Sequence, residues 1–183
     1  MMELWSGYFR AYANLADWQA SLIGNACRSM GLFPPCKGHG RGGAFGHKGK
    51  GHTVHLVVDR RGLPLAVSTT PANWAEVKQV LPLLQKIKPP KHSILQADKG
   101  YDSDPLRYKL GWLLGMGSAI PKRRYGDIAP HDPSKSTRWK VEQSHAHRHL
   151  SSRRTVVCYD KSLLSFSAFV ICSCIWRLIL NLV

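Results

Sequence analysis

Hydrophobic and polar residues are arranged along this chain in a pattern that predicts an N-terminal helix, then strands, and then alternating helices and strands. Thr53–Asp59 and Leu63–Thr69 are rich in β-branched residues and flank a short turn with Gly62, which predicts a β-hairpin. Gly31–Phe33 predicts the end of an earlier strand. The segment Gly31–Gly51 is dense in Gly, Pro, Lys and His, and it predicts a flexible basic loop.

Apolar residues with helical spacing predict a first helix at Leu4–Ile23, and helical spacing returns after the hairpin. Val77–Ile87 carries apolar residues three or four positions apart, with Pro82 as a candidate kink. Asn73 and Glu76 predict a capping box before this helix. The remaining predicted elements are strand Ser93–Ala97, helix Ser103–Leu114, strand Gly117–Pro121 and helix Arg138–Ser152. Three antiparallel strands followed by alternating helices and strands predict an α/β domain with a mixed sheet, ordered β-β-β and then α-β-α-β-α.

The charge balance narrows the class of partner. Among 183 residues, 26 Lys and Arg face 11 Asp and Glu, for a net charge of +15. Such a surplus favours a polyanion, because each neutralised phosphate releases counterions. Nucleic acid is therefore the expected partner, although charge alone names no reaction. The five cysteines have no regular spacing and no signal peptide is visible, which indicates a cytoplasmic protein.

The C-terminal segment is strongly apolar. Ser162–Val183 is long enough to resemble a membrane span, but Arg177 and Asn181 interrupt it. We favour a hydrophobic helix that packs against the domain, and no membrane partner is expected.

The few carboxylates can be weighed nearly one by one. Asp98 directly follows a predicted strand, and in α/β sheets the carboxyl ends of strands form the ligand crevice. A cap for the turn before Gly100 explains Asp98 equally well. Asp102 and Asp104 begin a helix, where negative charge is favourable, so we expect structural roles. Glu142 is isolated in a basic helix and either balances local charge or binds a divalent cation.

These carboxylates stand in motifs that resemble a known family. Ala-Asp-Lys-Gly-Tyr-Asp-Ser at 97–103 and Val-Glu at 141–142 resemble the DDE transposases of bacterial insertion sequences. The likeness spans roughly residues 31–170. Further matches are Gly46–Gly51, Val57–Asp59, Gly62–Leu65, Ala72-Asn73 with Glu76, Arg153-Arg154 and Tyr159–Lys161.

The resemblance implies an RNase H-like fold in which two Asp and one Glu hold two divalent cations, Mg²⁺ or Mn²⁺. Asp98 corresponds to the second Asp and Glu142 to the Glu. The implied reaction is metal-dependent cleavage and strand transfer of DNA phosphodiesters during transposition. The implied partners are double-stranded DNA of transposon ends and target, together with a homodimer as an open alternative, in a nucleoid-associated setting.

The first Asp of the family pattern is absent. It precedes a Gly on the first strand, and here Arg28–Phe33 places Met30 at that position. A thioether does not replace a carboxylate for a hard cation. One hypothesis is a frame slip, since ATCGATGGG encodes Ile-Asp-Gly and, read one nucleotide along, Ser-Met-Gly. Asp59 lies at the hairpin end of its strand, and we expect it to be structural.

Three segments are expected. Residues 1–25 resemble the tail of a helical DNA-binding region, residues 26–160 the catalytic domain, and residues 161–183 a hydrophobic helix. Because Met30 replaces an Asp, the activity is expected to be impaired or lost. The alternative function is a catalytically dead DNA-binding remnant that interferes with an intact transposase.

Other side chains allow competing interpretations. A zinc module is the main non-nuclease alternative, but its Cys and His spacings match no zinc pattern. His145, His147 and His149 alternate by two, and we interpret them as a polar surface. Trp74, Trp112 and Trp139 are expected in or near the core. The zinc candidates are Cys36, His39, His47, His52 and His55. The expected phosphate contacts are Lys48, Lys50, Lys122, Arg123, Arg124, Arg153 and Arg154.

Overall fold

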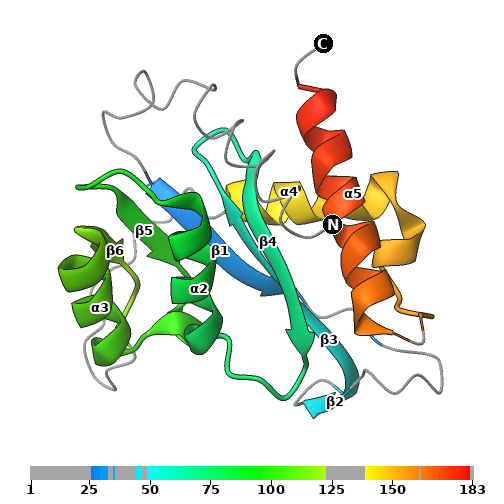
Figure 1. Ribbon diagram of the computed structural model, residues 1–183, viewed down its shortest axis with the longest axis horizontal. Coiled ribbons are helices and arrows are strands. Elements are labelled where there is room, and N and C mark those ends of the chain that lie inside the picture. The colour runs from blue at the N-terminus through cyan, green and yellow to red at the C-terminus, as the bar shows by residue number, and fades with distance from the viewer. Residues whose placement is uncertain are drawn as a thin grey trace.

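A six-stranded mixed sheet forms the centre of the computed structural model, which describes residues 26–32, 35, 44–46, 49–122, 139–160 and 162–181 (Figure 1). The strand order is β2-β3-β1-β5-β6, and β4 also pairs with β3. The strands are β1 Ala26–Leu32, β2 Ala44–Gly46, β3 Gly49–Val58, β4 Pro64–Pro71, β5 Ile94–Ala97 and β6 Gly117–Ala119.

The pairing directions follow the predicted order of elements. β1, β3 and β4 pair antiparallel, whereas β5 joins β1 in parallel and β6 joins β5 in parallel. β3 is buried along both faces from Gly51 to Val58, as its run of β-branched and apolar residues requires. The hairpin predicted around Gly62 is therefore confirmed as β3 and β4.

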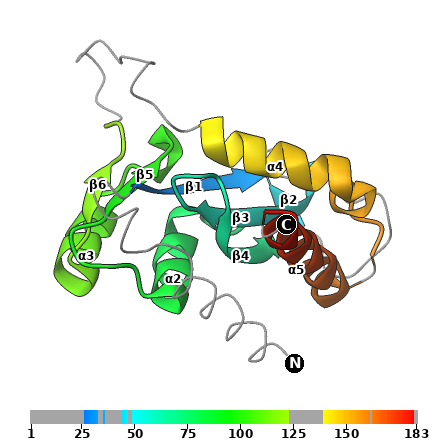
Figure 2. The same cartoon turned by 90° about the horizontal axis from the view of Figure 1, so that it is seen from above.

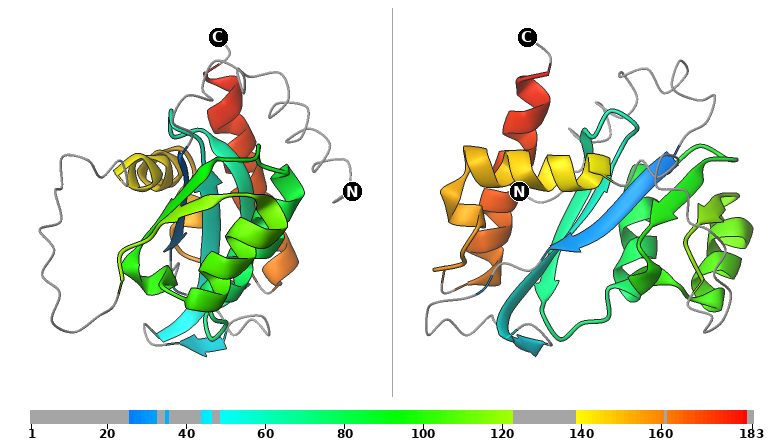
Figure 3. Two further views of the ribbon diagram at one scale, coloured as in Figure 1. Left: turned by 90° about the vertical axis from the view of Figure 1, so that its left-hand side faces the viewer. Right: turned by 180° about the vertical axis from the view of Figure 1, so that it is seen from behind.

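Helices cover both faces of the sheet (Figure 2). α2 (Val77–Ile87) and α3 (Asp104–Leu114) lie on one face, and α4 (Trp139–Ser151) lies on the other. The first face shares a core with the two helices that includes Val57, Leu84 and Leu95. On the opposite face Leu56 and Val58 pack with Val141 of α4. β1 lies between β3 and β5, at the middle of this arrangement (Figure 3).

The C-terminal helix α5 (Leu163–Ile179) packs against β4 and α4. Phe166 and Val170 are fully buried against Val54, and the Phe166 ring stacks on His52 with centroids 5.6 Å apart. Within the described part of the chain, no helix has the length and apolar character that a membrane crossing requires. The apolar residues of α5 thus complete the core beside the edge strand β4.

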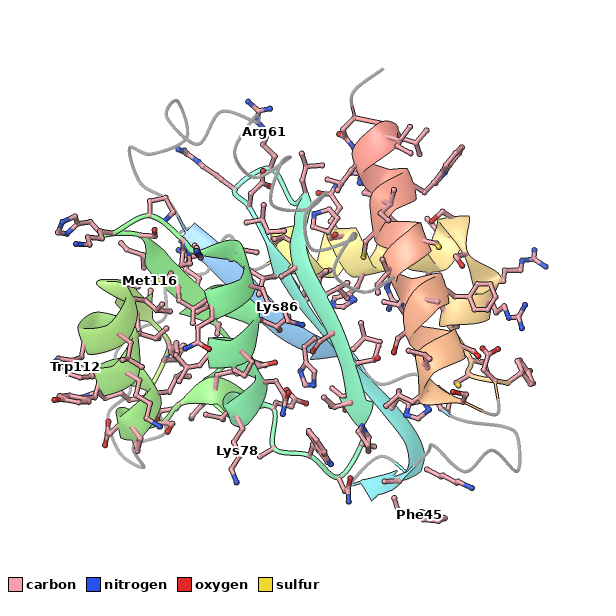
Figure 4. All side chains as sticks on the ribbon, in the orientation of Figure 1. Phe45, Arg61, Lys78, Lys86, Trp112 and Met116 are labelled. Carbon is pink, nitrogen blue, oxygen red and sulfur yellow. The ribbon has the colours of Figure 1, made fainter. Side chains whose placement is uncertain are left out.

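The structure corrects three local predictions. The segment predicted as a loop contains β2, and β3 begins at Gly49. α2 begins at Val77 with Glu76 as its N-cap, without a side-chain capping bond, so the capping box from Asn73 is wrong. Trp74 and Trp112 are 54% and 74% exposed instead of packed in the core. Figure 4 shows Trp112 projecting away from the sheet on the outer side of α3.

The observed architecture is the RNase H-like fold that the resemblance implied, with antiparallel β1, β3 and β4 followed by α2, β5, α3, β6 and α4. Several residues singled out above lie outside the described part of the chain. They are the segment 1–25, Cys36, His39, His47, Lys48, Arg123 and Arg124.

Candidate metal site at the carboxyl end of the sheet

The candidate ligand Asp98 follows β5, the parallel neighbour of β1. The register pairs Ser29 with Ala97, so Met30 and Asp98 are the next residues on two adjacent strands. Neighbouring strands lie about 5 Å apart. The backbone therefore brings position 30 beside Asp98, at the carboxyl end of the two strands.

The face on which Asp98 lies follows from strand alternation. Leu95 and Ala97 belong to the core shared with α2 and α3. Asp98 keeps an extended backbone, with φ −71° and ψ 160°. Because successive residues of a strand alternate between faces, Gln96 and Asp98 belong to the opposite face, the one that α4 covers.

Glu142 reaches the same face from α4. Met30 is paired across the sheet with Leu56, and Leu56 packs with Val141, the residue before Glu142. Glu142 itself is exposed near the start of α4. Two carboxylates and position 30 thus come from three elements to one side of the sheet.

Asp98 also holds its own loop in place. Its Oδ1 accepts a hydrogen bond from the Lys99 amide at 2.7 Å, and its carbonyl accepts from the Tyr101 amide at 2.9 Å. These bonds start the short 3₁₀ helix Lys99–Tyr101. The two interpretations of Asp98 are therefore compatible, since one half-buried carboxylate both caps a turn and faces the α4 side.

Asp102 has a structural partner, as expected. Its Oδ1 lies 2.6 Å from Nη2 of Arg107, and Nη2 also donates to the Ile120 carbonyl at 2.7 Å. Arg107 is a functional candidate that the sequence did not indicate. The Asp and Arg are five positions apart, and no helical or strand pattern pairs residues at that spacing.

Asp59 lies away from the candidate site. Its Oδ1 accepts hydrogen bonds from the amides of Arg61 and Leu63, each at 2.8 Å, which closes the hairpin turn. Burial raises the pKa of the Asp59 carboxyl, against the opposing effect of these amides. Since Leu56 is the residue opposite position 30, Asp59 is about 10 Å further along β3. Its structural role is confirmed.

The donor set fits a divalent cation only in part. Asp98 and Glu142 supply the charged oxygens that Mg²⁺ and Mn²⁺ prefer. The family pattern is expected to place a third carboxylate at position 30, where the sequence has Met30. Across the residues that the structure describes, no three His, Cys, Asp or Glu side chains gather into a metal-binding group.

The described basic candidates do not form one patch. Lys122 follows β6 near the carboxyl edge that carries Asp98 and is exposed. Lys50 is six residues from Leu56 along β3, about 20 Å away. Arg153 is exposed beyond the end of α4. Arg154 pairs with Asp160 at 3.0 Å and lies 4.0 Å above the ring of Phe169.

Two of the zinc candidates are core residues. His55 is buried on β3, with Nε2 2.8 Å from the Thr70 hydroxyl, and burial lowers its pKa to about 4. His52 is buried against Phe166, and burial lowers its pKa as well. Both histidines are neutral packing groups within the sheet.

The inner face of α4 corrects the interpretation of His145, His147 and His149 as one polar surface. His145 and Arg148 are 3% and 2% exposed, whereas His147 is exposed as predicted. Arg148 Nη2 lies 3.1 Å from His149 Nε2 and 3.5 Å from His145 Nδ1. Val141, Ser144, His145 and Arg148 have the spacing of one helix face. Their polar identities hid that pattern in the sequence.

Comparison with known proteins finds transposases among the matches of this chain. Residues 33–161 match a family model described as a transposase DDE domain, a range that includes Asp98 and Glu142 and begins after Met30. The chain is 33% identical over 134 residues to a transposase of insertion sequence element IS402 from Burkholderia cepacia, covering 68% of this chain and 61% of that protein. This chain thus spans about three fifths of that relative's length.

Two further likenesses are more distant. A transposase of insertion sequence element IS6501 from Brucella ovis is 29% identical over 129 residues, covering 67% of this chain and 95% of that protein. The cryo-EM structure of a piggyBac transposase synaptic complex with hairpin DNA matches with a TM-score of 0.46 and 10% identity. It covers 62% of this chain and 26% of the piggyBac chain.

Proposed function

Because the chain belongs to the transposase DDE domain family, we propose that it is the catalytic domain of an insertion-sequence transposase whose DNA cleavage activity is impaired at position 30. The observation that carries the proposal is the parallel register of β1 and β5, which brings Met30 beside Asp98. In this proposal Asp98 and Glu142 are the surviving metal ligands, and DNA is the substrate.

In this proposal the site retains part of the chemistry of a two-metal nuclease. Divalent ions, when bound, would activate a water or a terminal hydroxyl and stabilise the leaving oxygen of a DNA phosphodiester. The Lys99 amide donates to the Asp98 carboxylate and holds its orientation. Glu142 approaches from α4 and is open to solvent. Met30 supplies neither a negative charge nor an oxygen ligand, so two carboxylates would bind the metal ions where the family pattern has three.

DNA contact is proposed for two exposed basic side chains in different parts of the domain. Lys122 is exposed near the carboxyl end of β5, and Arg153 is exposed at the far end of α4. With a net charge of +15, the chain has the balance that favours a phosphate backbone. Lys48, Arg123 and Arg124 remain candidates from the sequence, and Arg154 has a structural partner in Asp160.

The decisive test replaces Met30, the residue at which the chain departs from the three-carboxylate pattern of the family. Met30→Asp is expected to bind Mn²⁺ about tenfold more tightly than the wild type, because site charge sets affinity for hard cations. Electron paramagnetic resonance of free Mn²⁺ measures the change. Met30→Leu is the matched control, since it removes the thioether and adds no carboxylate. Asp98→Asn and Glu142→Gln should each abolish the gain of Met30→Asp.

A second assay follows the reaction itself. We expect Mg²⁺- or Mn²⁺-dependent cleavage of transposon-end DNA by Met30→Asp to exceed that of the wild type. If Met30→Asp gains neither metal affinity nor cleavage, the assignment of position 30 is wrong. The sequence of the locus is a separate check on the frame slip, because an overlapping frame that encodes Asp-Gly is required.

The alternative function is that of a DNA-binding remnant in which a carboxylate at position 30 would not restore DNA cleavage. The positive charge of the chain and the loss of a carboxylate at position 30 favour it. It predicts metal-independent DNA binding by both wild type and Met30→Asp, with no cleavage by either. Inhibition of an intact transposase by the added chain would support this function.

A further inference from the structure

A partly buried ion pair lies at the end of the loop that begins with the candidate ligand Asp98. Arg107 of α3 donates through Nη2 to Asp102 Oδ1 at 2.6 Å and to the Ile120 carbonyl at 2.7 Å, and Nη1 lies 3.4 Å from the Ser118 hydroxyl. The side chains of Arg107 and Asp102 are 20% and 15% exposed. This shielding from solvent makes the pair stronger than a surface salt bridge.

The pair joins three segments at one point. Asp102 ends the loop between β5 and α3, Arg107 comes from the second turn of α3, and Ser118 and Ile120 lie in and after β6. One guanidinium therefore fastens the loop to both the helix that follows it and the neighbouring edge strand. A lysine ammonium has one nitrogen, so it lacks the second arm of the planar fork with which Arg107 also reaches the Ser118 hydroxyl.

The Arg107–Asp102 ion pair is connected to Asp98 by the hydrogen bonds of one short turn. The Asp102 amide donates to the Lys99 carbonyl at 3.1 Å, and the Tyr101 amide donates to the Asp98 carbonyl at 2.9 Å. The Lys99 amide in turn donates to the Asp98 carboxylate. A shift of Asp102 therefore disturbs the same turn that orients the Asp98 side chain.

We propose that Arg107 is a positioning residue for the metal site: it holds Asp102, and through the turn 98–102 it fixes the orientation of the Asp98 carboxylate. The inference rests on the proposed function, because it takes Asp98 to be a metal ligand. It also assigns Asp102 to the support of the site, since its carboxylate is already paired with a guanidinium. Partners that orient a ligand in this way commonly affect metal affinity by 10- to 100-fold, on the order of the effect expected here.

The first experiment measures metal affinity in the Met30→Asp background. Arg107→Gln is expected to weaken Mn²⁺ binding by about tenfold or more. Arg107→Lys should recover only part of the loss, because it restores the charge but not the fork. Asp59→Asn is the matched control. It removes a structural carboxylate that closes a turn elsewhere in the sheet, so it should lower stability and leave Mn²⁺ affinity unchanged.

The second experiment needs no metal. Hydrogen exchange of the Lys99, Tyr101 and Asp102 amides reports the turn directly, because all three donate within it. Arg107→Gln should speed their exchange by about tenfold relative to the Met30→Asp parent, as expected for local opening. Amides of β3 should exchange at the parent rate in the same sample.

The outcomes separate this inference from the proposed function. If Met30→Asp binds Mn²⁺ through Asp98 and Arg107→Gln leaves both affinity and exchange unchanged, the positioning role is refuted while the proposed function stands. Faster exchange with unchanged affinity also refutes it, because the pair is then merely structural. If Met30→Asp shows no Asp98-dependent binding, the proposed function itself fails.

Discussion

Replacing Arg148 by methionine is expected to stabilise the fold. Arg148 is 2% exposed on the inner face of α4, and its Nε and Nη1 atoms have no hydrogen-bond partner. Within the described part of the chain it forms no ion pair. Burial lowers its pKa, which means that the charged form is penalised where it lies. Its neighbour Cys174 has a thiol pKa raised by burial to about 12, so the thiol stays neutral and supplies no counter-charge.

The magnitude follows from the contacts of this side chain. Two unsatisfied buried donors cost about 1–3 kcal/mol each. The two contacts of Nη2 to His145 and His149 return about 1 kcal/mol each, and methionine loses them. Methionine keeps an unbranched stem of similar length, so little cavity is left. The net gain expected for Arg148→Met is therefore about 0–4 kcal/mol, which overlaps the effect of about 0–4 kcal/mol seen when buried ion pairs are replaced by apolar groups.

Urea unfolding followed by far-UV circular dichroism measures this gain. Arg153→Met is the matched control, because Arg153 is exposed just beyond α4 and its loss should change the free energy of unfolding by less than about 0.5 kcal/mol. An Arg148→Met protein that is less stable than the wild type would refute the reasoning. It would mean that the guanidinium is satisfied in solution, for example by buried water.

Two further predictions concern the core. His55 is buried in its neutral form, and burial lowers its pKa from 6.5 to about 4. Between these pH values only the unfolded state takes up the proton. The free energy of unfolding should therefore fall by about 3 kcal/mol as the pH drops from 6.5 to 4. His55→Gln should flatten this slope in urea titrations between pH 7 and pH 4, and an unchanged slope would assign the loss to other groups. Phe166→Ala should lower the free energy of unfolding by about 3–5 kcal/mol, because Phe166 is fully buried and stacks on His52. Trp176→Ala, at a site 52% exposed on the same helix, should cost much less, and equal costs would mean that α5 is not part of the core.

Local patterns in the sequence determined the elements of this protein. The β-branched runs on either side of Gly62 became β3 and β4, and the apolar stripe of Val77–Ile87 became α2 with matching ends. The family motif placed Asp98 after a strand and Glu142 on a late helix, as the structure has them. These predictions succeeded because periodicity and turn chemistry act over a few neighbouring residues.

Only the tertiary structure decided which distant residues meet. The parallel register of β1 and β5 brings Met30 beside Asp98, and the packing of α4 on β3 brings Glu142 to the same face. The contact of Arg107 with Asp102 and Ile120 joins segments with no shared period. The burial of Arg148 depends on which face of α4 docks, and its polar residues gave no hydrophobic stripe to reveal that face. Such contacts depend on how whole elements pack, which no local pattern contains.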